Sequence, residues 1–257
     1  MWVKLNNDMR YHVGIGCSFG RPNHSAHKIL ADKLGAEFIN LSESSKGNFR
    51  IYTELLQWAS ANRKILKDTT VSIGWSGIWR NDVITDANKF GDLKHDLAYK
   101  WTTWRADRHN ETLKNMPSEM EIDLDQKVRF YTYVIGAQNF MQNLGIKYVM
   151  YNALDPSIDD DNLKNWKRVR LKTLESQIDQ KHFFKFTTSH SAFVAENKYF
   201  LDPSPVGILK YIHNIKKNWH QTEMHMDGKV SDAHPSPEGN SKWAELVWQF
   251  SKDNQIL

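Results

Sequence analysis

The chain has 257 residues, which is enough for one large domain or two small ones and for a sizeable buried core. Its net charge of +4 comes from 34 basic and 30 acidic residues that are scattered rather than gathered in one run, so the sequence argues against a nucleic acid partner and favours a mixed solvated surface. Cys17 is the only cysteine, which excludes an intramolecular disulfide and a cysteine-based structural zinc site.

Neither a secretion signal nor a membrane anchor is predicted. The first ten residues lack an apolar segment with a small-residue cleavage site, and no later stretch approaches the roughly 18 apolar residues of a membrane span. We therefore expect no membrane partner and a location in the cytoplasm of the producing cell, and association with a virion is left open. The oligomeric state is not predicted.

Strands and helices are predicted in alternation along the first third of the chain. Short buried strands are expected at residues 12–19 (HVGIGCSF), 37–41 and 69–75, and amphipathic helices at residues 23–34 and 49–66. Another helix and strand are expected at residues 128–144 and 147–154. This alternation predicts an α/β fold with a mainly parallel sheet covered on both faces, and we expect one domain over residues 1–257.

Three later segments complete the prediction. Residues 82–125 are polar, Trp-containing and without a clear strand. We interpret them as an insertion or lid that covers a functional site. Residues 181–200 could be an extra strand pair or an irregular loop. Ser236 as N-cap and Pro237 at the first helical position predict a C-terminal helix.

A glycine-flanked hydroxyl follows the first predicted strand. In Gly16-Cys17-Ser18-Phe19-Gly20, the serine lies at a strand-to-helix turn, where its backbone N–H could point at an oxyanion. Taken alone, this pentapeptide is more typical of a simple turn or capping serine. We expect Cys17 to point away from Ser18 and to fill a small buried apolar position.

A second segment with catalytic residue types lies near the other end of the chain. It reads Asp232-Ala233-His234-Pro235, followed by the predicted helix start. The proline restricts the backbone of the histidine, and an acid two residues earlier could orient the imidazole. Taken alone, the pair could be a surface ion pair.

Together the two segments resemble the SGNH or GDSL-like hydrolase family, and the order Ser, Asp, His and the near-full-length span both match it. The resemblance is closest to a divergent branch, common among bacteriophage and bacterial proteins, with GCSF in place of GDS and a last block D-x-H-P-S-x-x-G. It implies a flavodoxin-like three-layer α/β/α fold without metal or organic cofactor. It also implies Ser18 as nucleophile, His234 as general base and Asp232 as the acid that holds the imidazole.

The same resemblance implies an oxyanion hole. In the family's second block a glycine N–H is a donor, and Gly47 takes that place here, although a simple Gly-Asn turn is the alternative. The family's third block, G-x-N-D, reads Gly74-Trp75-Ser76-Gly77 in this chain, so Ser76 takes the place of the expected asparagine. The predicted donors are therefore the Ser18 and Gly47 N–H groups and the Ser76 hydroxyl. Further candidate substrate contacts are Asn48, Trp75, Arg80 and Asn81, and Arg80 or Asn81 could also replace the missing asparagine.

Other polar residues have simpler interpretations. His24 and His27 follow the serine at helical spacing, but two histidines without a third ligand are more typical of a surface than of a metal site. Glu223, His225 and Asp227 are interpreted as a solvated loop.

The sequence therefore predicts a serine esterase that hydrolyses a small or carbohydrate-linked, acetyl-type ester. Two alternatives stay open at this point. The chain could be a non-catalytic binding or structural protein with the same fold, because the third-block asparagine is missing. It could also be a flavodoxin-like domain in which residues 16–20 cradle a phosphate at a helix N-terminus.

Overall fold

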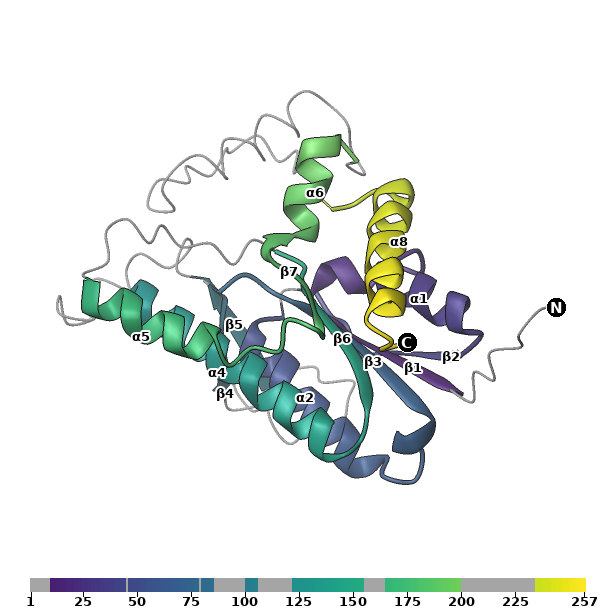
Figure 1. The fold of residues 1–257 in the computed structure, drawn as a ribbon, viewed down its shortest axis with the longest axis horizontal. Helices are drawn as coiled ribbons and strands as arrows, with labels where there is room; N and C mark the ends of the chain where they lie inside the picture. The colour runs from purple at the N-terminus through teal and green to yellow at the C-terminus, as the bar shows by residue number, and fades with distance from the viewer. Residues whose placement is uncertain are drawn as a thin grey trace.

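The structure is a computed structural model that describes residues 10–44, 46–78, 80–85, 100–105, 122–154, 165–199 and 234–257. Its centre is a five-stranded sheet with the strand order β2-β1-β3-β6-β7, in which all neighbours run parallel (Figure 1). The strands are β1 (Tyr11–Gly16), β2 (Glu37–Asn40), β3 (Thr69–Trp75), β6 (Lys147–Asn152) and β7 (Phe183–Ser189). This is the flavodoxin-like order, so the predicted fold class is confirmed.

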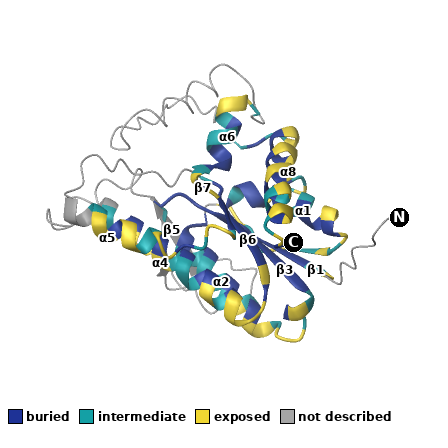
Figure 2. Ribbon diagram, in the orientation of Figure 1, coloured by how far each residue is buried: buried dark blue, intermediate teal, exposed yellow. Residues whose placement is uncertain are grey.

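The central strands are buried on both sides. All seven residues of β3 and five of the six residues of β1 are buried, as the dark blue of the sheet in Figure 2 shows. Continuous burial of this kind is typical of a parallel sheet that carries helices on both faces.

Two layers of helices cover the sheet, and each layer has its own apolar cluster. The layer of α2 (Asn48–Ala61), α4 (Ile122–Asn143) and α5 (Asn165–Glu175) packs with side chains such as Val71 and Ile73. The opposite layer contains α1 (Ala26–Leu34) and α8 (Pro237–Asp253), which pack on the other face of β6. A short helix, α6 (His190–Asn197), follows β7 directly and contacts α8.

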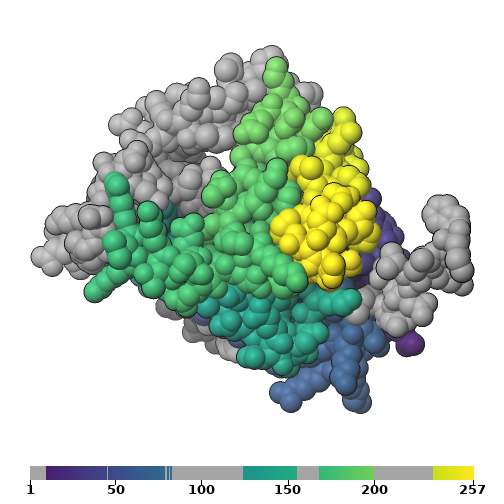
Figure 3. Space-filling view, viewed as in Figure 1, coloured from purple at the N-terminus to yellow at the C-terminus, as the bar shows by residue number. Residues whose placement is uncertain are grey.

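Helices from opposite parts of the sequence meet in the second helical layer. Residues of α8 contact residues of α1, and Figure 1 shows the two helices side by side. On the face shown in Figure 3, α8 (yellow) lies beside the green segment that contains β7 and α6. The predicted start of α8 is confirmed, because the Gly239 N–H donates to the Ser236 hydroxyl over 3.1 Å and Pro237 is the first helical residue.

The prediction that residues 82–125 contain no strand is wrong. A separate antiparallel pair is formed by β4 (Arg80–Thr85) and β5 (Lys100–Arg105), and α4 already begins at Ile122. The rest of the predicted insertion, residues 86–99 and 106–121, lies outside the described residues.

Other elements also differ from the prediction. Residues 181–200, which had no single assignment, form β7 and α6. The helix α5 was not predicted, because its residues are mostly polar and, among residues 168–175, only Leu171 lies deep in the core. Two short 3-10 helices, η1 (Ser18–Gly20) and η2 (Leu66–Asp68), occupy connections.

Candidate active site at the carboxyl end of the sheet

Ser18 lies directly beyond the carboxyl end of β1. This strand stands between β2 and β3, so the chain leaves it at the point where successive strands run to opposite sides of the sheet. In open α/β sheets, ligands bind at this topological switch point. Ser18 is partly exposed, whereas its neighbours Cys17 and Phe19 are buried. Among the described residues, the Ser18 hydroxyl has no hydrogen-bond partner.

The turn that follows Ser18 does not form the phosphate cradle of the third alternative. It is only a three-residue 3-10 helix, and the first full helix, α1, begins at Ala26. The N-terminus of α1 is capped by its own chain, because the Ser25 hydroxyl accepts a hydrogen bond from the Lys28 N–H over 3.3 Å. The free helix N-terminus that a phosphate would need is therefore not formed by this loop.

His234 reaches the same loop from the other end of the chain. Its imidazole lies 5.4 Å from the ring of Phe19, measured between ring centroids. Because Phe19 directly follows Ser18, this contact brings the segment of the predicted base to the loop that contains the predicted nucleophile. The predicted acid, Asp232, lies outside the described residues.

A second histidine, His190, also packs against Phe19, and the sequence did not single it out. His190 is the first residue after β7, is 1% exposed, and stacks on Trp243 of α8 with 4.9 Å between ring centroids. The Phe19 ring meets it edge-on at 5.5 Å. A row of rings, Trp243, His190, Phe19 and His234, therefore connects α8, the end of β7, the nucleophile loop and the last block. Burial lowers the pKa of His190 to about 3, so the ring is neutral.

A series of buried, hydrogen-bonded polar side chains lies beneath the loop of residues 16–20, which contains the predicted nucleophile, on the α1 side of the sheet. His27 Nδ1 is 2.6 Å from the Ser72 hydroxyl, which is 2.8 Å from His12 Nε2. His12 Nδ1 is 2.7 Å from the Thr70 hydroxyl, which in turn donates to the Tyr11 carbonyl over 3.4 Å. Burial lowers the pKa of both histidines to about 3, so both rings are neutral.

The position of each proton in this series of hydrogen bonds can be assigned by starting from Thr70. Thr70 donates its single hydroxyl proton to the backbone, so its oxygen accepts from His12 Nδ1–H. His12 Nε2 is then an acceptor and takes the Ser72 proton, and the Ser72 oxygen accepts from His27 Nδ1–H. The remaining nitrogen, His27 Nε2, carries a lone pair. The Tyr151 hydroxyl lies 3.4 Å from it, and burial raises the pKa of this phenol, which keeps the proton to donate.

Glycines make room for this chain of side chains under the loop. A Cβ at Gly16 would lie 3.2 Å from His27 Nε2, and one at Gly20 would lie 2.9 Å from the same atom. His27 is 1% exposed, so its interpretation as a surface residue is wrong. The sequence did contain a sign of this buried polar layer. On the face of the sheet toward His27, alternate residues of β1 and β3 are histidine, glycine, threonine or serine instead of large aliphatic residues.

Gly47 does not have the role that the resemblance implies. Its N–H donates to Asp82 Oδ1 over 2.9 Å, and the Arg50 N–H donates to Asp82 Oδ2 over 2.8 Å. Through these two bonds Asp82, a residue of β4, caps the N-terminus of α2. The glycine is required by this contact, because a Cβ at Gly47 would lie 2.6 Å from Asp82 Oδ2 and 2.8 Å from the Arg80 carbonyl oxygen. In this conformation the Gly47 N–H does not face an oxyanion.

Ser76 and Asn48 are brought together. The Ser76 N–H donates to Asn48 Oδ1 over 2.8 Å, and Asn48 Nδ2 donates to the Ser76 carbonyl over 3.0 Å. Both residues are buried, so Asn48 does not present its amide to a substrate in the way predicted. Trp75 is also buried and packs edge-on against Phe130.

The remaining predicted contacts lie on β4. Arg80 Nη1 donates to the Lys46 carbonyl over 3.4 Å, and the backbone of Asn81 pairs with that of Trp104. Lys46 is itself buried, and its ammonium group pairs with Glu54 and donates to the Leu41 carbonyl. Burial lowers the pKa of Lys46, whereas Glu54 acts in the opposite direction. This ion pair stabilises the loop between β2 and α2, beside Gly47.

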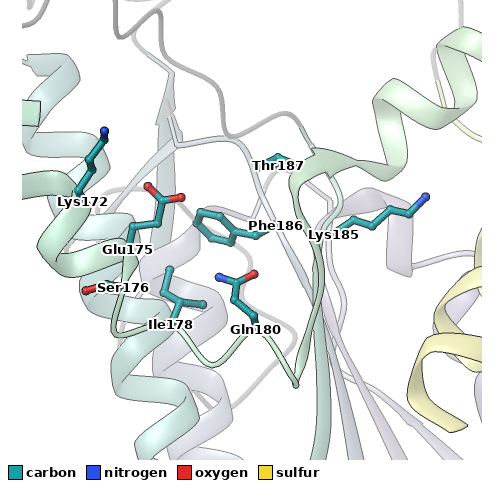
Figure 4. A pocket seen from close by; sticks show the side chains of 8 residues that line it. All are labelled: Lys172, Glu175, Ser176, Ile178, Gln180, Lys185, Phe186 and Thr187. Carbon is teal, nitrogen blue, oxygen red and sulfur yellow. The ribbon is translucent and has the colours of Figure 1, made fainter. Parts of the chain in front are cut away.

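A hollow of about 620 Å³ lies elsewhere, between α5 and β7 (Figure 4). Lys172 and Glu175 of α5 and Lys185 and Phe186 of β7 line it, and none of the predicted site residues does. Within the described ranges, no group of three potential metal-ligating side chains is found. None of the described helices has both the length and the apolar character that a bilayer span requires.

A family model described as a family of unknown function, DUF6071, matches residues 5–196. The chain belongs to this family. The match runs from β1 to α6, so it includes Ser18 and Ser76 and ends before His234. No curated protein matches the sequence.

Solved structures that are similar to this member of DUF6071 include esterases and lipases. An esterase, EstA, from Pseudoalteromonas sp. is 11% identical with a TM-score of 0.46, over 95% of this chain and 97% of that chain. A lipase, Lip_vut3, from a goat rumen metagenome is 9% identical with a TM-score of 0.48, over 94% and 97%. A GDSL-like lipase from Bacteroides thetaiotaomicron is 11% identical with a TM-score of 0.39, over 98% and 93%. Likeness of this degree does not decide an activity, which depends on the residues of this chain.

Proposed function

We propose that the chain is a serine esterase that hydrolyses a small ester through an acyl-serine intermediate. Ser18 is the nucleophile, His234 is the general base and Asp232 holds the imidazole. The observation that carries the proposal is the 5.4 Å contact between the rings of Phe19 and His234. It joins two segments more than 200 residues apart in the chain, each of which is weak evidence alone, at the switch point of the sheet.

The reaction has two halves. Ser18 Oγ attacks the ester carbonyl carbon while His234 takes the hydroxyl proton, and the carbonyl oxygen becomes an oxyanion. The tetrahedral intermediate collapses when the C–O bond to the alcohol breaks, and His234 returns the proton to the leaving alcohol. A water molecule then attacks the acyl-serine with His234 again as base, which releases the acid and restores Ser18.

Two donors are proposed for the oxyanion. One is the Ser18 N–H, at the turn after β1, and the other is the Ser76 hydroxyl, at the end of the neighbouring strand β3. Gly47 is left out in this conformation, because its N–H is bonded to Asp82. Donors held in place before the reaction stabilise the developing charge without the cost of reorganisation.

For the substrate class we propose a short acyl ester, with an acetylated carbohydrate as the first candidate. Tryptophans at positions 101 and 104 of β5, the strand paired with β4, support a carbohydrate, because aromatic faces suit sugar rings.

The rival proposal is a non-catalytic binding protein with the same fold. One observation favours it, namely that Asp82 already occupies the N–H group of Gly47, which the resemblance assigns to the oxyanion. A binding protein would retain the fold and could bind a ligand but would not turn over esters.

Hydrolysis of p-nitrophenyl acetate by the purified chain and by a Ser18→Ala variant separates the two proposals. The esterase proposal predicts a loss in kcat of about 10³-fold or more in Ser18→Ala. Ser176→Ala is the matched control, because Ser176 is an exposed serine after α5 and should leave the rate unchanged. Equal rates in all three proteins would contradict the esterase and favour the binding protein.

A further inference from the structure

Ser18 and Ser76 occupy equivalent places on neighbouring strands. Gly16 of β1 is paired with Gly74 of β3 in the parallel register, and each serine lies two residues beyond its glycine. Adjacent strands of a sheet run about 4.8 Å apart. Ser18 and Ser76 therefore both follow the carboxyl ends of strands that lie side by side in the sheet.

The backbone of Ser76 is held by a side chain from another element. Asn48, the first residue of α2, accepts from the Ser76 N–H over 2.8 Å and donates to the Ser76 carbonyl over 3.0 Å. The amide thus bonds both main-chain groups of one residue, as a neighbouring strand would. Asn48 is 3% exposed and Ser76 is 1% exposed, so water does not compete for these bonds.

The hydroxyl of Ser76, unlike its backbone, is not bonded by Asn48. It is buried, and no hydrogen-bond partner for its oxygen exists among the residues that the structure describes. A buried hydroxyl without a partner costs stability, and buried polar groups in proteins are normally bonded. The backbone of Ser76 is held in place, while its hydroxyl has no partner in the resting protein among the described residues. Such a hydroxyl is suited to donate a hydrogen bond to a negative charge that forms only during the reaction.

We propose that Asn48 is the positioning residue of the oxyanion hole: its amide clamps the Ser76 backbone so that the Ser76 hydroxyl donates to the oxyanion formed at Ser18. This rests on the proposed esterase function. Asn48 itself does not touch the substrate, because its amide oxygen and nitrogen are both bonded to Ser76.

A double-mutant cycle tests this assignment with p-nitrophenyl acetate. Ser76→Ala should lower kcat about 100-fold with little change in KM, as for the removal of one oxyanion donor. Asn48→Ala should lower kcat at least about 10-fold. In the Ser76→Ala background, Asn48→Ala should have almost no further effect on kcat, because it acts only through that hydroxyl. Losses that multiply in the double variant would overturn the proposal.

Asn152→Ala is the matched control for this cycle. Asn152 is a buried asparagine at the end of the next strand, β6, and its amide bonds the Phe186 and Thr188 carbonyls of β7 over 2.8 and 3.3 Å. Its loss removes a similar clamp from a different strand. The factor by which Asn152→Ala changes kcat should therefore be the same in the wild-type background and in the Ser76→Ala background.

Asn48→Asp keeps the test usable if Asn48→Ala does not fold. The carboxyl group that this substitution introduces can, while protonated, still donate to the Ser76 carbonyl and accept from its N–H, whereas the ionised carboxylate cannot donate. The kcat of Asn48→Asp relative to the wild type should therefore fall as the pH rises. A constant ratio would overturn the positioning role.

The esterase proposal and this inference can fail separately. If the wild-type chain and Ser18→Ala hydrolyse the ester equally, both are overturned. If Ser18→Ala is inactive but the effects of Asn48 and Ser76 multiply, only the positioning role is overturned.

Discussion

Lowering the pH from 7 to 5 should destabilise the fold, because three imidazoles are buried in the neutral form. Burial lowers the pKa of His12, His27 and His190 from 6.5 to about 3. In the unfolded chain these groups bind a proton as the pH falls below 6.5, whereas in the folded chain they stay neutral until about pH 3. Stability is therefore full above pH 6.5 and is lost progressively as the pH falls from there toward 3.

The size of the effect follows from the pKa difference. At pH 5 each histidine is 1.5 pH units below its unfolded pKa, which corresponds to about 2 kcal/mol at 1.36 kcal/mol per unit. Three such groups together cost about 6 kcal/mol, compared with a total stability of about 5–15 kcal/mol for a domain. The loss is large enough to unfold a protein at the lower end of that range.

Urea unfolding at pH 7 and pH 5, followed by tryptophan fluorescence, measures this loss. The control is His190→Phe, which keeps a flat ring between Phe19 and Trp243 and removes one of the three ionisable groups. The variant should lose about one third less stability than the wild type between the two pH values. The reasoning is refuted if the wild type has the same unfolding midpoint at both.

Two further substitutions test the buried contacts. Ser72→Ala removes the bonds that the hydroxyl makes to His12 Nε2 and His27 Nδ1, which leaves His27 Nδ1 only the longer 3.4 Å contact with the Tyr151 hydroxyl. It should cost about 2–6 kcal/mol of unfolding free energy, at about 1–3 kcal/mol for each of the two groups, measured by urea unfolding. Ser251→Ala, which removes one bond to a helix carbonyl, should cost clearly less, and equal losses would contradict the network. Asp82→Ala removes the cap of α2 and should cost about 1 kcal/mol in the same assay, and a loss below the measurement error would contradict the capping role.

The elements that the sequence predicts well are those determined by local pattern. The prediction for β3 matches residue for residue, because residues 69–75 are rich in the β-branched and aromatic types that favour strands. The start of α8 follows from Ser236 and Pro237 alone. By contrast, β4 and β5 lack a strong strand pattern and are defined by pairing with each other across residues 86–99.

The assignment of Ser18, Asp232 and His234 to an active site stays a prediction. The serine and histidine motifs are short local patterns, and the structure brings the two segments that contain them into contact through Phe19 and His234. The role of Gly47 was mistaken because its partner, Asp82, is 35 residues away in a hairpin that the sequence did not predict. His190 was missed because no motif accompanies it. Its importance depends on the rings that the fold stacks around it.

The central claim is that Ser18 is a nucleophile activated by His234, and covalent labelling tests it most directly. An organophosphate such as diethyl p-nitrophenyl phosphate should react with Ser18 Oγ, with release of p-nitrophenolate and transfer of the serine proton to His234. Mass spectrometry should then find one diethylphosphoryl group per chain, on Ser18, with esterase activity lost in proportion to labelling. An active enzyme that gains no adduct, or gains it on another residue, would contradict the account.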